Sequence, residues 1–596
     1  MASGTSRIAR PPGPPAQADS SAGAPARRWS QLRARFTPER LALTLFTLAV
    51  VAAIAAPLVE VVLRSFQQQT GLVGSTWSTA NYRQLSGSQI LKSAENSAVI
   101  AVGTTAIATV IGVALAWLVA RTDLPFRRAF TVLNLIPFFL SPLIGSIAWT
   151  YLGDPRVGLI NRVARSIGLD GGTLFNIYSL YGIIIVLGLF LSPFVMLLCG
   201  AAFRQMDSSL EHAAQASGAG TWRTTVRVTL PLAAPTIVAA AFLVFVLAVE
   251  DLSVPLVLGY SSGIRTLSTQ IYDAIQNFPP NYNFAAALGC VMMVFTALCL
   301  WIQRRVLRNR GYVTVAGRAS RQAALRLGRG RWVAFAAEVL YLLVAAVAPV
   351  GILAVVAFSQ RWTGRIDLGQ LTLHNFSALF GSGSTAPGAF VHSLELSALS
   401  ACVVVAVSVV VVYALERARI TGRRLFEVCL TVPVAVPGLA LAVGMLTLLL
   451  HSPLFGTLWI IGLAYIVRYL SLAHRSVSAA FGAVSPELEE AARLSGAAWF
   501  AYTRRVLLPL LRPGLTAGWL LTFLTFMKEL PMSALLQTTG TQTLSVALLN
   551  GISFDSPGEA AAFTLLQAAL LLVVAGAFWA VATRGDDDVA SLAVGL

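Results

Sequence analysis

Long apolar runs separated by short polar stretches fill most of this chain of 596 residues. A helix that crosses a bilayer needs roughly 20 consecutive, mainly apolar residues. By that measure the pattern predicts about twelve membrane-spanning helices, and the expected fold is an all-α polytopic membrane protein. The runs lie near 41–65, 96–120, 129–152, 177–202, 232–259, 284–303, 333–358, 392–415, 425–451, 454–474, 513–536 and 560–583.

The composition agrees with this fold class. Hydrophobic residues make up 56% of the chain and charged residues only 12%, whereas a soluble protein carries about a quarter charged residues. So few charges do not cover the surface of a soluble globule of this size. Lipid is therefore the expected solvent for most of the chain.

The net charge of +17 comes from 43 basic and 26 acidic residues. Its distribution argues against nucleic-acid binding, because the arginines gather in short stretches between the apolar runs, as in loops retained on the cytoplasmic side. Arg121, Arg223, Arg417 and Arg504 lie in four such stretches. The opposite orientation would break the positive-inside rule at nearly every short loop, so both termini are expected in the cytoplasm.

The segments outside the apolar runs suggest a division of the chain. Residues 1–40, rich in Pro, Ala, Ser and Arg, are expected to be a disordered cytoplasmic N-terminus without a cleaved signal peptide. A first transmembrane domain is expected at 41–303 and a cytoplasmic linker at 304–332. A second transmembrane domain is expected at 333–583, followed by a C-terminal tail at 584–596.

The two halves of the chain are copies of each other. Residues 96–130 align without gaps on 392–426, sharing a serine near the start and closing arginines before a Phe. Residues 211–235 align much more closely on 489–513. Six expected spans per half, an even number, keep the copies in the same orientation, so the duplication is parallel rather than inverted.

The best-matched block is a polar connector. The pattern Glu-x-Ala-Ala-x-x-Ser-Gly-Ala begins at Glu211 and again at Glu489, and each copy continues to Arg-Val-x-Leu-Pro-Leu. The Glu-Ala-Ala stretch predicts a short helix with a small-residue face that admits a close partner. Gly218 and Gly496 suit a helix end that needs a left-handed residue, and the prolines mark entry to the next span.

Two interpretations of this connector are open at this point. It is either an ordinary amphipathic loop kept similar by duplication, or a docking site for a cytoplasmic partner. The second explains why a polar loop matches best while the membrane helices have diverged, and we favour it. The candidate residues are Glu211, Ala213, Ala214, Gly218, Pro231, Glu489, Ala491, Ala492, Gly496 and Pro509.

This Glu-Ala-Ala…Gly…Leu-Pro loop resembles the coupling loop of binding-protein-dependent ABC importer permeases of the first structural type. The resemblance covers about 90–300 and 390–583 and implies two tandem six-helix permease halves. It also implies two partners: an ABC ATPase subunit, expected in two copies because there are two loops, and an extracytoplasmic solute-binding protein. The implied location is a bacterial cytoplasmic (inner) membrane.

A second block narrows the resemblance. Glu250–Gly259 is followed by Arg265–Tyr272, and the second half holds Lys528–Met532 followed by Gly540–Val546. The block is similar to fused iron(III)-type permeases, although Leu-Ser stands in the first copy where Phe-Gly is usual. Ferric iron is the solute that this resemblance implies first. Related permeases for thiamine, polyamines or phosphonates share much of the block and remain alternatives.

Several patterns expected of an enzyme are missing from the sequence. Neither Lys92 nor Lys528 follows a glycine-rich stretch, so no phosphate-binding loop of the G-x-x-x-x-G-K-[ST] type exists. The five cysteines lie in or beside apolar runs without metal-ligand spacing, and the histidines are scattered. We therefore expect a transport subunit rather than an enzyme, without a cofactor or metal site of its own.

Charged residues inside apolar runs are the remaining site candidates, because a charge at the bilayer centre costs about 2.5–3.5 kcal/mol and usually faces a cavity. Glu250 and Asp251 occupy positions equivalent to Lys528 and Glu529 in the alignment of the halves. They either line the translocation path or hold the two halves together. A proton- or sodium-driven secondary transporter would also show buried carboxylates, but it would not need two loops for docking an ATPase.

Overall fold

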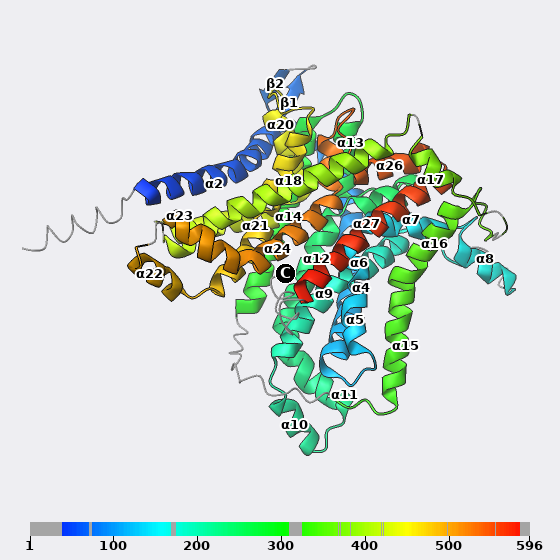
Figure 1. Ribbon diagram of the computed structural model, residues 1–596. Coiled ribbons are helices and arrows are strands. Elements are labelled where there is room, and N and C mark those ends of the chain that lie inside the picture. The colour runs from blue at the N-terminus through cyan, green and yellow to red at the C-terminus, as the bar shows by residue number, and fades with distance from the viewer. Residues whose placement is uncertain are drawn as a thin grey trace, which may run out of the picture.

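The computed structural model describes residues 38–70, 74–168, 174–308, 325–366, 369, 371–381, 383–418, 420, 422–496, 499–554 and 556–583. Nearly all of the expected N-terminal segment and C-terminal tail, and much of the linker, fall outside these residues. The described chain is largely helical (Figure 1). A small antiparallel hairpin of β1 (Gln67–Thr70) and β2 (Gly74–Trp77) pairs Gln67 with Trp77.

Each half contributes a matching series of helices that form its expected spans, some of them in shorter consecutive pieces. In the first half these are α2 (Pro38–Ser65), α4 (Ser88–Arg121), α5 (Arg127–Leu133), α6 (Ile136–Phe139), α7 (Pro142–Gly153), α9 (Leu180–Gln205), α12 (Leu230–Glu250) and α14 (Tyr282–Arg308). In the second half they are α15 (Gly330–Leu342), α16 (Ala348–Phe358), α18 (Ala386–Val412), α19 (Arg423–Ala435), α20 (Gly438–Leu449), α21 (Leu458–Gly482), α24 (Leu508–Met527) and α27 (Pro557–Thr583).

Short helices connect the long ones. They are α3 (Ala80–Gln84), α8 (Leu159–Ser166), α10 (Ser209–Ala216), α11 (Thr221–Thr224), α13 (Leu267–Gln276), α17 (His374–Leu379), α22 (Pro486–Leu494), α23 (Trp499–Tyr502), α25 (Pro531–Leu536) and α26 (Leu544–Phe554).

The helices agree with a polytopic membrane protein. The described residues contain nine helices long and apolar enough to cross a membrane, or up to eleven if each of two bent pairs is one span. The bends measure 89° between 127–139 and 142–153, and 99° between 423–433 and 438–449. The remaining expected run, 454–474, lies mostly in α21, which has 25 residues but carries Arg468, His474 and Arg475. A count of twelve is thus consistent with the structure.

The two halves interlock through their first helices. α2 packs along α20 of the second half, where the carbonyl of Pro57 lies so close to Gly444 that a Cβ would collide with it. In the same way, α16 packs against α7 of the first half. Figure 1 shows α2 on one flank and α15 with α16 on the other. Each half therefore buries part of its own surface against a helix of the other.

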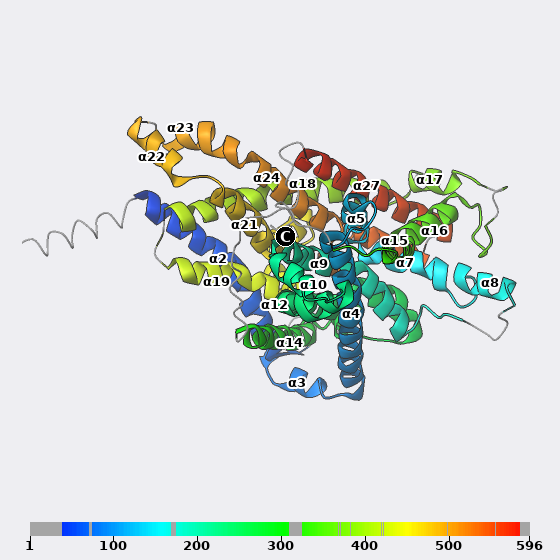
Figure 2. The ribbon, with the colours of Figure 1, turned by 90° about the horizontal axis from the view of Figure 1, so that it is seen from below.

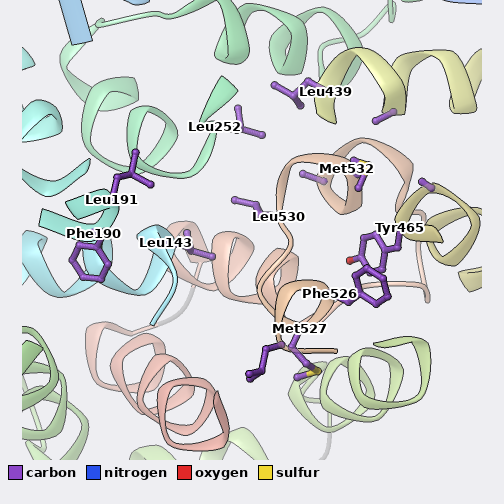
Figure 3. Close-up of a cluster of buried hydrophobic side chains, with 14 of the residues drawn as sticks. Leu143, Phe190, Leu191, Leu252, Leu439, Tyr465, Phe526, Met527, Leu530 and Met532 are labelled. Atoms are coloured by element: carbon purple, nitrogen blue, oxygen red, sulfur yellow. The ribbon is translucent and has the colours of Figure 1, made fainter. Parts of the chain in front are cut away.

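Apolar side chains from both halves fill the centre of the molecule (Figure 3). The ring of Tyr465 stacks on Phe526 with centroids 5.1 Å apart, and its hydroxyl hydrogen-bonds to Ser533 at 2.5 Å. This core surrounds the breaks that follow α12 and α24, so the charges at those breaks lie at the contact between the halves. The labelled residues are Leu143, Phe190, Leu191, Leu252, Leu439, Tyr465, Phe526, Met527, Leu530 and Met532.

Candidate functional site

The first connector is a helix–glycine–helix elbow made by α10 and α11. Gly218 has a φ of +85°, and Ala219 N–H donates to the carbonyl of Ala214 at 3.0 Å while Gly218 N–H donates to Gln215 at 2.9 Å. These two bonds close the end of α10 around a left-handed residue. The left-handed conformation predicted for Gly218 is confirmed.

At the start of the connector, hydrogen bonds from the backbone and hydroxyl of Ser209 hold the pKa of Asp207 below its usual value.

The second connector likewise contains two short helices, α22 and α23. Gly496 has a φ of +75°, again as predicted. In each half the elbow leads through one π-helical segment into the next long helix: η1 (Thr225–Thr229) before α12 and η7 (Thr503–Leu507) before α24. Pro231 and Pro509 each follow directly on the π-helical segment, within the continuous helices Thr221–Glu250 and Thr503–Met527.

Both connectors project from the helical bundle. In Figure 1 α10 lies at the bottom and α22 at the left, and the view from below separates them as well (Figure 2). Ala213 and Ala491 are exposed, and Ala214 and Ala492 are half-buried. The side chain of Glu489 lies outside the described residues. The small-residue faces are thus available to a partner in both halves.

Glu211 lies on the other side of its helix, facing the bundle. Its side chain is 2% exposed and forms an ion pair with Arg121, the last residue of α4. Its second oxygen accepts a hydrogen bond of 2.6 Å from Thr229 Oγ1. The glutamate of the first motif therefore contacts the permease body, while the alanines face outward.

The four intramembrane charges singled out in the sequence lie around one cavity of about 160 Å³ between the halves. Glu250 is paired with Arg468, whose Nη2 lies 2.8 and 2.9 Å from the two carboxylate oxygens. Gly438 N–H, at the bend before α20, donates to Glu250 at 3.3 Å. Arg468 also donates to the carbonyl of Val436. The carboxylate of the first half thus contacts the broken helix of the second.

The ammonium of the second half makes the reciprocal contact. Lys528 Nζ donates to the carbonyl of Phe138 at 2.7 Å and lies 4.2 Å from the centroid of its ring. Phe138 stands just before the bend between α6 and α7. Glu250 and Lys528, equivalent in the two halves, therefore each contact the bend of the opposite half.

Asp251 and Glu529 cap the helical turns that follow them. Asp251 Oδ1 accepts the N–H of Val254 at 2.9 Å. Glu529 accepts the N–H groups of Met532 and Ser533 at 3.1–3.2 Å. Backbone donors compensate these carboxylates in place of a cation, and both residues line the cavity.

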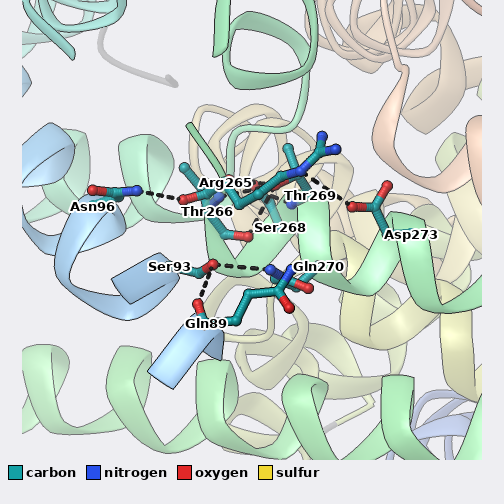
Figure 4. Close-up of polar contacts among 9 residues, drawn as sticks. All are labelled: Gln89, Ser93, Asn96, Arg265, Thr266, Ser268, Thr269, Gln270 and Asp273. Atoms are coloured by element: carbon teal, nitrogen blue, oxygen red, sulfur yellow. Dashed lines mark hydrogen bonds and ion pairs between the residues drawn. The ribbon is translucent and has the colours of Figure 1, made fainter. Parts of the chain in front are cut away.

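The Arg-Thr-Leu-Ser block of the first half connects α13 to α4 through hydrogen bonds (Figure 4). Thr266 caps α13, Leu267 N–H donates to Ser97 Oγ at 2.9 Å, and Asn96 Nδ2 donates to the carbonyl of Arg265 at 2.9 Å. The second half repeats the serine contact, with Leu544 N–H donating to Ser393 at 2.6 Å. This explains the serine shared by the two halves and gives the block a structural role.

The described residues contain no group of three or more His, Cys, Asp or Glu side chains placed to hold a metal ion.

The family described as "Binding-protein-dependent transport system inner membrane component" matches residues 108–311 and 403–584 of the chain. The two matches coincide with the two halves and include both connectors.

The chain belongs to this family. It is a membrane-spanning permease of an ABC importer, a class that works with an ATPase and a substrate-binding protein. Members of the family are transport subunits rather than enzymes.

Three relatives show how far the likeness extends. The ferric transport system permease protein of Actinobacillus pleuropneumoniae is 25% identical over 481 residues, which cover 78% of this chain and 68% of that protein. A probable molybdenum ABC transporter permease protein of Haloferax volcanii is 30% identical over 35% of this chain and 74% of its own. A Salmonella typhi protein named for 2-aminoethylphosphonate transport is 26% identical over 38% of this chain and 86% of its own.

Sequence reasoning missed one functional candidate in the permease. Arg468 lies in the middle of the apolar run 454–474 and lines the same cavity as the four predicted charges. The sequence feature that could have identified it is an arginine inside an expected span, because a charged side chain there costs free energy unless it is paired. Its counterpart in the first half is Phe190, so comparison of the halves drew attention to paired charges and away from a lone one.

Proposed function

We propose that this permease imports ferric iron delivered by an extracytoplasmic binding protein. The observation that carries the proposal is that a ferric permease matches along both halves, whereas the molybdenum and phosphonate relatives match little more than a third of the chain. Oxygen ligands suit hard cations, and two carboxylates, Asp251 and Glu529, line the cavity between the halves. Thiamine and polyamines have no such support among these relatives.

The proposed path passes through this cavity. Asp251 and Glu529 are the residues proposed to meet the passing cation, since Glu250 is occupied by Arg468. Their oxygens already accept backbone N–H groups, so binding in transit should be weak, and capture belongs to the binding protein. Weak binding in mid-path allows release on the far side.

Neutralising both carboxylates tests this path. The Asp251→Asn, Glu529→Gln double variant retains side-chain oxygens that accept the same backbone hydrogen bonds, so the fold should be preserved. Ferric iron uptake should fall about tenfold or more, because the cavity loses the two carboxylates proposed to meet the cation while Arg468 and Lys528 remain beside it. Uptake is measured in proteoliposomes with the ATPase and binding protein present, and co-purification of the ATPase serves as the folding control. Full uptake by the double variant would remove these residues from the path.

We further propose that each connector docks one copy of a separate ATPase subunit, giving two copies per permease. Support comes from the repeated elbow geometry, from the exposed small residues on both connectors and from the missing phosphate-binding loop in the sequence. ATP hydrolysis is then the work of the partner, and the permease itself is proposed to hold no cofactor.

The proposed location is the bacterial inner membrane with both termini cytoplasmic, which places both connectors and the linker 304–332 inside. The transmembrane domains proposed for this topology are 41–303 and 333–583. The arginine-rich stretches support this orientation.

Labelling of single cysteines in a cysteine-free background tests the orientation. Phe278 is 88% exposed between α13 and α14, and Trp222 is 75% exposed in α11. A membrane-impermeant thiol reagent added outside should label Phe278→Cys and leave Trp222→Cys unlabelled until the membrane is opened. The reverse pattern would overturn the topology.

A further inference from the structure

One buried ion pair connects several helix ends near the first connector. Arg121 and Glu211 have side chains that are each 2% exposed. Besides its bond to Glu211, the guanidinium of Arg121 donates to the carbonyls of Phe203 at 3.1 Å and Met206 at 3.3 Å, where α9 ends. Glu211 in turn accepts a hydrogen bond from Thr229, the last residue of η1 before α12. The pair thus joins α10 to the ends of α4, α9 and α12 at a single point.

The second half contains an equivalent arginine that is bonded to backbone carbonyls at a helix end. Arg417, the counterpart of Arg121 in the alignment of the halves, donates to the carbonyls of Phe481 at 3.2 Å and Val484 at 2.7 Å. Phe481 and Val484 are the counterparts of Phe203 and Met206. The helices around them have diverged in sequence, yet the contact between arginine and helix end is kept in both halves.

The neighbouring residue on α10 faces the other way. Leu210 is 51% exposed, and its counterpart Leu488 on α22 is 45% exposed. An exposed leucine beside exposed alanines makes an apolar outer face on both connectors. Leu210 and Glu211, about 100° apart on one short helix, therefore lie on different faces: Leu210 is free for a partner, and Glu211 is bonded to the membrane body.

We propose that Arg121 and Glu211 are positioning residues that form a rigid joint, through which movement of α10 reaches α4, α9 and α12. The motif glutamate transmits movement and does not bind the ATPase, which contacts the outer face around Leu210. This rests on the proposed docking of the ATPase on the connector. A buried, charge-assisted joint suits the task, because its partners are fixed in direction and exchange with water is excluded.

The joint and the docking face predict different defects in the full importer of permease, ATPase and binding protein. Glu211→Gln should retain the ATPase but reduce the stimulation of ATP hydrolysis by loaded binding protein about tenfold, a loss within the usual range for coupling between sites. Leu210→Asp should instead release the ATPase during purification. The two variants are adjacent on one helix and serve as controls for each other.

A second variant guards against simple misfolding. Glu211→Gln leaves Arg121 buried without its anion, so the double variant Arg121→Met, Glu211→Gln is compared with it. The double variant should regain yield and thermal stability, because no unpaired charge remains, but it should stay uncoupled. A purely structural pair would instead regain coupling together with stability.

The possible outcomes separate the joint from the docking site. Normal stimulation in Glu211→Gln, restored stimulation in the double variant, or loss of the ATPase from Glu211→Gln as from Leu210→Asp would each overturn the joint. Failure of the wild-type permease itself to retain an ATPase would overturn the proposed docking function. The proposed role of Arg121 and Glu211 rests on that docking and would be overturned as well.

Discussion

Replacing Arg468 with methionine is expected to destabilise the permease strongly. The side chains of Arg468 and Glu250 are 10% and 15% exposed, so the variant leaves a carboxylate unpaired between the halves. Breaking one side of a buried ion pair costs about 3–5 kcal/mol. The bend before α20 also loses a donor, since Arg468 holds the carbonyl of Val436. Thermal unfolding of the detergent-purified chain should show a clear fall in midpoint.

The control is the double variant Glu250→Gln, Arg468→Met, which removes both charges. Neutral replacements of a buried pair are often tolerated, so most of the lost stability should return, and the cycle of single and double variants gives the coupling energy. Equal stability of the Arg468→Met variant and the wild type would show that the pair does not hold the halves together.

Valine at both Gly218 and Gly496 should abolish coupled transport while the chain still inserts. Both glycines have positive φ, and among the described residues nothing beyond the neighbouring chain lies within 4 Å of where a Cβ would stand. The penalty is therefore purely conformational, about 1–2 kcal/mol for an L-residue in this region. The end of each docking helix should fray or tilt, taking the alanines out of register with the ATPase. ATP hydrolysis stimulated by loaded binding protein and solute uptake should fall together.

Gly220 supplies a matched control within the same connector. It too has open space around it, but its φ is −68°, so Gly220→Val adds the same side chain without left-handed strain. Normal coupling in the control and loss in the double variant is the expected pair of results. Wild-type coupling in the Gly218→Val, Gly496→Val chain would mean that these connectors do not transmit movement.

Much of the architecture could be predicted from the sequence, because lipid imposes a strong local signal. Apolar runs predict the spans, and comparison of the halves predicts left-handed conformations for Gly218 and Gly496. The same comparison paired Glu250 with Lys528, and the structure places both on one cavity. These features depend on residue type and spacing, which the sequence carries directly.

Other features depend on contacts between distant segments. The crossing of α2 and α16 onto opposite halves comes from tertiary packing, which no single apolar run specifies. The direction of Glu211 could not be predicted either, because it depends on Arg121, ninety positions away in the chain. A short helix with a glutamate and two alanines is compatible with either face turned outward.

Uptake of radioactive ferric iron tests the proposed function most directly, in proteoliposomes that contain this permease, a separate ATPase subunit and the iron-loaded binding protein. We expect uptake that requires ATP and all three components, and that an excess of molybdate or 2-aminoethylphosphonate does not compete. Iron uptake by the permease alone, driven by a proton or sodium gradient without the ATPase, would contradict the proposed function.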